Sequence, residues 1–102
     1  MLVTLVEVVE RSRHHSGSAE HRKAYSLREV TINPSHVVCL REDHQMLRML
    51  SEGYLPEDMD SRQTFTRIHL DRGQVGSSIT VVGDPNTISE KLGVSRRQLL
   101  RG

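Results

Sequence analysis

Residues 25–41 read Tyr-Ser-Leu-Arg-Glu-Val-Thr-Ile-Asn-Pro-Ser-His-Val-Val-Cys-Leu-Arg, and this stretch decides the fold. Valine, isoleucine, threonine and tyrosine favour strands over residues 25–32 and 36–41. Between them, Asn33-Pro34-Ser35 predicts a turn, because proline presets its own backbone angle and asparagine is favoured at the first turn position. The stretch therefore predicts two strands joined as a hairpin.

Three further segments have strand character. Residues 2–9 read Leu-Val-Thr-Leu-Val-Glu-Val-Val and are apolar on both faces, which indicates a central strand or one covered by a partner chain. Residues 64–70 alternate between two faces, and residues 78–82 are rich in β-branched side chains. A turn region from Asp71 to Gly76 links these last two strands.

Two short helices are expected from their capping residues. The Asp43 carboxylate can accept hydrogen bonds from the free amides of a first helical turn, and Gly53 is placed to end that helix. Asp84 and Pro85 form a typical helix start, and Gly93 ends the second helix.

These elements predict an α+β fold, with a curved antiparallel sheet or small open β-barrel of about five strands and two short helices. Residues 1–93 form a single β-rich domain, which includes a mobile basic loop over 10–23 and an acidic, helical insert over 42–62. Residues 94–102 form a basic tail. The core is thin for a chain of 102 residues, so a homo-oligomer, a dimer or larger, is expected.

Composition excludes several classes of protein. The formal net charge is only +1, which does not indicate a dedicated nucleic-acid binder. No apolar run approaches the length that crosses a bilayer, so no membrane partner is expected. The single cysteine, Cys39, cannot form an internal disulfide, which favours a cytoplasmic protein.

The strand over residues 64–70 suggests an anion site, because Arg67 and His69 share one face with Phe65. Arginines beside an aromatic ring suit phosphate and base recognition. The alternative is that Arg67 and His69 lie on the solvated face of an antiparallel sheet. The candidate ligand-binding residues are Arg28, Phe65, Arg67, His69, Arg72 and Asn86.

The C-terminal segment offers a different hypothesis. Residues 87–101 resemble the core of a helix-turn-helix unit, in which Ser95 caps a second helix and Arg96, Arg97 and Gln98 contact DNA. Against this, seven residues follow Ser95, which gives about two helical turns. The DNA-binding interpretation is therefore the weaker one.

Catalysis and metal binding have little support in the sequence. No nucleophile elbow and no phosphate-binding glycine-lysine loop is present, although His69 with Asp71 leaves a small hydrolase as an alternative. His14, His15 and His21 lack the acids or cysteines that complete a metal site. We expect no enzymatic activity, no cofactor and no metal.

Part of the chain resembles known families. Residues 28–38, 79–82 and 87–92 are similar to the short flagellar FlbD-like proteins and to compact β-proteins of unknown role common in bacteriophages; the resemblance spans residues 28–40 and 64–92. It implies a strand, an Asn-Pro turn, a strand, a further hairpin and a terminal amphipathic helix. The segments 10–23 and 42–62 depart from that pattern.

The resulting hypothesis is a small, non-enzymatic binding protein, phage-encoded or accessory, in the cytoplasm of its host. The phage-like resemblance implies that such a protein binds a host protein or sequesters a small molecule without turnover. From the basic candidate residues, the small molecule is expected to be anionic and nucleotide-like. A DNA-binding regulator and a small hydrolase are the alternatives.

Overall fold

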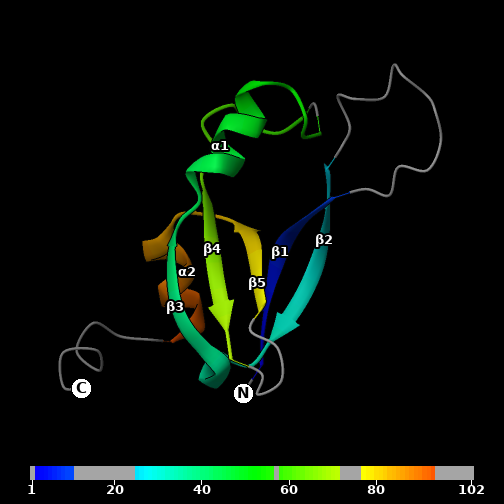
Figure 1. Cartoon of the computed structure of the whole chain (residues 1–102). Coiled ribbons are helices and arrows are strands. Elements are labelled where there is room, and N and C mark those ends of the chain that lie inside the picture. The colour runs from blue at the N-terminus through cyan, green and yellow to red at the C-terminus, as the bar shows by residue number, and fades with distance from the viewer. Residues whose placement is uncertain (1, 11–24, 57, 72–76, 94–102) are drawn as a thin grey trace.

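The computed structural model describes residues 2–10, 25–56, 58–71 and 77–93. A five-stranded antiparallel sheet with two helices confirms the predicted α+β class, and the sheet is open and curved (Figure 1). Within these ranges no helix is long and apolar enough to cross a membrane. The elements are β1 (Val3–Glu10), β2 (Tyr25–Ile32), the 3-10 helix η2 (Pro34–His36), β3 (Val37–Glu42), α1 (His44–Ser51), β4 (Phe65–Leu70), β5 (Ser77–Val82) and α2 (Pro85–Leu92).

The strands lie in the order β2-β1-β5-β4-β3. Strand β1 pairs with β2 along its whole length, but it pairs with β5 only at Glu7 and Val8. It is therefore a central strand, as its apolar sequence predicted. The hairpin of β4 and β5 is also confirmed, since the two strands pair from Phe65 opposite Val82 to Leu70 opposite Ser77.

The predicted hairpin of β2 and β3 is wrong, because these strands lie at opposite edges of the sheet. The turn itself forms where it was expected: the Asn33 side chain accepts a hydrogen bond from the Ser35 amide at 3.0 Å. After the turn, the Asp71 amide donates to the carbonyl of His36 at 2.9 Å, which fixes the start of β3 beside β4. A turn redirects the chain, but the pairing partners of each strand are set by the whole sheet.

One hydrophobic cluster lies between the sheet and α2. Asp84 caps the start of the helix, where its carboxylate accepts a hydrogen bond from the hydroxyl of Thr87 at 2.6 Å, and Gly93 caps its end with a φ of 77°. Ile88 and Leu92 face the sheet, as expected from their spacing. The buried members of this cluster are Leu5, Ile32, Ile68, Val81, Ile88 and Leu92.

A second cluster lies under α1, which stands beyond the ends of β3 and β4 in Figure 1. Asp43 caps α1 by accepting from the amide of Met46 at 3.0 Å, and Gly53 follows the helix with a φ of 86°. Both features confirm the predicted helix. The buried members of the second cluster are Val8, Met46, Leu55 and Phe65.

Gly83 connects β5 to α2, and alanine at this position is expected to lower the free energy of unfolding by about 2 kcal/mol. Its φ of 126° disfavours any side chain, and an added Cβ would lie 3.0 Å from Cδ1 of Ile88, which is itself buried. Chemical denaturation measures the loss. The control is Gly53→Ala, because Gly53 also has a positive φ, of 86°, but has open space around it. Equal losses in the two variants would contradict a role for the Ile88 contact.

Candidate functional site

The residues predicted on β4 share one face but have different surroundings. Phe65 is 0% exposed and belongs to the cluster under α1, so its ring is not available to a ligand. The Arg67 side chain is 39% exposed. His69 is half-buried, opposite Ser78 on β5 and Cys39 on β3. Of these three predicted residues, Arg67 lines the pocket described next, and Phe65 and His69 do not.

The remaining predicted ligand-binding residues do not join Arg67. Arg28 on β2 forms an ion pair with Glu7, with 3.4 Å between its Nε and Oε1. Asn86 is exposed in the first turn of α2, which packs on the opposite face of the sheet from Arg67. Outside the described residues lie Arg72, Arg96, Arg97, Gln98, the tail 94–102 and the basic loop from residue 11 onward.

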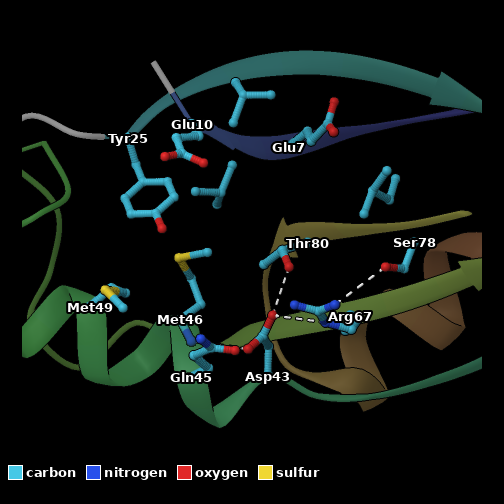
Figure 2. A pocket seen from close by; sticks show the side chains of 13 residues that line it. Glu7, Glu10, Tyr25, Asp43, Gln45, Met46, Met49, Arg67, Ser78 and Thr80 are labelled. Carbon is cyan, nitrogen blue, oxygen red and sulfur yellow. Dashed lines mark hydrogen bonds and ion pairs between the residues drawn. The ribbon is translucent and has the colours of Figure 1, made fainter. Parts of the chain in front are cut away.

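A pocket of about 280 Å³ opens between α1 and the strands β1, β4 and β5 (Figure 2). It arises because β1 and β5 pair over so short a stretch. Beyond that pairing, Val9 and Glu10 of β1 and Ser78 and Ile79 of β5 line the opening. Tyr25, the first residue of β2, closes one side.

One wall of the pocket is a network of polar side chains centred on Asp43. Its Oδ2 accepts a hydrogen bond from the Thr80 hydroxyl at 2.6 Å and lies 3.4 Å from Nε of Arg67. Arg67 Nη1 in turn donates to the hydroxyl of Ser78 at 3.3 Å. These contacts join α1, β4 and β5, and they fix the position of the Arg67 guanidinium at the pocket.

The protonation state of Asp43 follows from these contacts. Burial of the carboxyl by itself raises its pKa, but hydrogen bonds from Thr80 and from the Met46 amide, together with the charge of Arg67, outweigh burial and lower the pKa below 3.8. Asp43 is therefore a carboxylate at neutral pH.

The opposite wall is apolar, and a carboxylate stands at its edge. Met46 and Met49 of α1 line it, with the ring of Tyr25 beside them (Figure 2). Glu10 pairs with Tyr25 across β1 and β2, so their side chains are neighbours on one face. Among the described residues, the Glu10 carboxylate has no hydrogen bond and no ion pair, whereas the Glu7 carboxylate is held by Arg28.

This pocket could not be predicted from the sequence, although one of its residues could. Asp43 was predicted to cap a helix, and a capping carboxylate next to a strand can also reach neighbouring strands. Glu10 was assigned to the loop over 10–23, but it is the last residue of β1 and lies opposite Tyr25, the first residue of the next strand. What the sequence did not reveal was the short pairing of β1 with β5.

Comparisons of the chain with protein-family models, curated proteins and solved structures found no match. Within the described part of the chain, no three His, Cys, Asp or Glu side chains are grouped as a metal site requires. The histidines at positions 14, 15 and 21 lie outside it.

Proposed function

We propose that this chain is a non-enzymatic binding domain whose ligand occupies the pocket between α1 and strands β1, β4 and β5. The main support for this proposal is the position of the Arg67 guanidinium. It is held by Asp43 and Ser78 in a pocket that is also lined by the methionines of α1. Ligand sites are typically apolar cavities with a few polar groups placed in advance, and this pocket has both features.

The chemistry of the polar wall supports binding more than catalysis. A general base works best with a pKa near the working pH, whereas the pKa of Asp43 is lowered and its carboxylate is already engaged by three donors. The Arg67 guanidinium offers hydrogen-bond donors and no acceptor, so it does not act as a base. Both groups are suited to orient a ligand.

Blocking the pocket tests the proposal. Gln45 lies on the exposed surface of α1 and lines the pocket, so Gln45→Trp is expected to fill it without disturbing the core. Titration with aromatic fragments that carry ammonium, hydroxyl, carboxylate or phosphate groups should shift the methyl resonances of Met46 and Met49. In the Gln45→Trp protein, affinity should fall by about tenfold or more, equal to about 1.4 kcal/mol.

Arg48→Trp is the matched control, because it adds the same bulk to an exposed position on α1 that does not line the pocket. It should leave binding unchanged, and the bound fragment should be recovered chemically intact by mass spectrometry. The proposal is overturned if no fragment shifts the two methionines at millimolar concentration, if both tryptophan variants bind alike, or if the fragment is converted.

A further inference from the structure

We infer that the pocket selects a primary ammonium group attached to a small flat apolar body, and that Glu10 is the residue that recognises the ammonium. This inference rests on the proposed binding function, and it names the ligand chemistry of the same site. It differs from the anionic ligand expected from the sequence.

The charge balance of the pocket is the first support. Three acidic residues line it, Glu7, Glu10 and Asp43, against one basic residue, Arg67. Asp43 is paired with Arg67, and Glu7 is paired with Arg28. Among the described residues, this leaves the charge of Glu10 without a partner, so the pocket has an excess of negative charge that attracts a cation.

The position of Glu10 is the second support. It stands directly across the strand pair from Tyr25, and Figure 2 shows its carboxylate next to the tyrosine ring. The Tyr25 amide donates to the carbonyl of Tyr54 at 3.1 Å, which holds this end of β2 against the segment after α1. A carboxylate beside an aromatic ring face provides both an ion pair and a cation–π contact for one ammonium group.

The apolar wall beside Glu10 and Tyr25 fits the apolar body of such a ligand. Met46 and Met49 present flexible, polarizable thioethers, which adapt to flat rings and make favourable sulfur–aromatic contacts. The volume of about 280 Å³ is near the lower limit for ligand pockets, which suits one ring with a short chain.

An anionic ligand has a weaker case at this site. The Arg67 guanidinium already donates from Nε toward Asp43 and from Nη1 to Ser78. A phosphate would compete with the Asp43 carboxylate for Arg67 and would also be repelled by Glu10. The same guanidinium can instead hydrogen bond a neutral or weakly polar atom at the far end of the ligand.

The test compares three probes of nearly equal size: phenethylamine, phenylethanol and phenylacetate. Calorimetry and the Met46 and Met49 methyl shifts report binding at neutral pH. We expect the amine to bind about tenfold more tightly than the alcohol, and the acid to bind least, since a charge-assisted hydrogen bond to Glu10 and a cation–π contact with Tyr25 together are worth about this factor. Added salt should weaken binding of the amine more than binding of the alcohol.

Glu10→Gln keeps the shape of the side chain and removes its charge. It should lower amine affinity about tenfold while alcohol affinity changes by less than about twofold. Glu29→Gln is the matched control, because it makes the same change at an exposed position of β2 that does not line the pocket.

The outcomes distinguish the preference for ammonium from the proposed binding function. If all three probes bind equally, or the acid binds best, the preference for ammonium is overturned while the pocket remains a binding site. If Glu10→Gln weakens the alcohol as much as the amine, the role assigned to Glu10 is overturned. If no probe shifts Met46 or Met49, the proposed binding function itself fails.

Discussion

Replacement of Phe65 by alanine is expected to lower the free energy of unfolding by about 4 kcal/mol. The ring is 0% exposed and is the largest fully buried side chain of the protein's described part. It packs with Val8 of β1, with Met46 of α1 and with Leu55 after the helix. Removing it leaves a cavity where three separate segments meet.

Urea denaturation followed by circular dichroism measures this loss. A domain of this size is stable by about 5–15 kcal/mol, so the variant should unfold at much lower urea concentration or fail to fold at all. Val38→Ala is the control, because Val38 is 64% exposed on the edge strand β3 and should matter little. A loss for Phe65→Ala no larger than that for Val38→Ala would contradict the packing described here.

Replacement of Asp43 by alanine is expected to lower the free energy of unfolding by about 3 kcal/mol. The side chain is only 3% exposed, and it accepts from the Thr80 hydroxyl, the Met46 amide and the Arg67 guanidinium. The variant loses a helix cap and also leaves the buried Thr80 hydroxyl without its acceptor. Because Arg67 is partly exposed, water can replace its lost partner.

Asp84→Ala is the matched control for Asp43→Ala. Asp84 caps α2 in the same way, through the amide and hydroxyl of Thr87, but it makes no contact with the polar wall of the pocket. The Asp84→Ala variant should lose clearly less free energy of unfolding than Asp43→Ala when both are unfolded in urea. Equal losses would mean that Asp43 stabilises the protein only as a helix cap.

The pH dependence of stability provides a second measurement on Asp43. Its pKa in the folded protein is lowered from 3.8, so its contribution is complete above about pH 4 and is lost as the pH falls through the folded-state pKa. An Asp43→Asn variant lacks this ionisation and should lose less stability than the natural protein on acidification below pH 4. Parallel curves for the two proteins would contradict the lowered pKa.

Local chemistry explains why most elements could be predicted. Asp43 with Gly53 and Asp84 with Gly93 mark helix ends by rules that act within a few residues, and the structure confirms both helices. The alternation from Phe65 to Leu70 likewise fixed which side chains of β4 share a face. Such signals depend only on neighbours in the sequence.

The partners of the strands could not be predicted in the same way. The turn at Asn33 was expected correctly, yet β2 pairs with β1 and β3 pairs with β4. Which strands pair depends on how the apolar side chains are buried over the whole sheet. For the same reason, the sequence grouped Arg28 and Asn86 with Arg67, although they lie on a distant strand and on the helix of the other face.

Self-association stays a prediction. The thin core that motivated it is supplemented in the structure by the two helices, which bury Met46, Ile88 and Leu92. Exposed apolar side chains also occur, at Leu2, Val6, Leu27 and Val38.

The short pairing between β1 and β5 has a consequence for the order of folding. Strand β1 is made first during synthesis, and its complete pairing with β2 is available once residue 32 has appeared. Strand β5 pairs with β1 much later in the sequence, at Glu7 with Val81 and at Val8 with Thr80. Because closing a long loop costs more entropy than closing a short one, we expect the pairing of β1 with β2 to form before the pairing of β1 with β5.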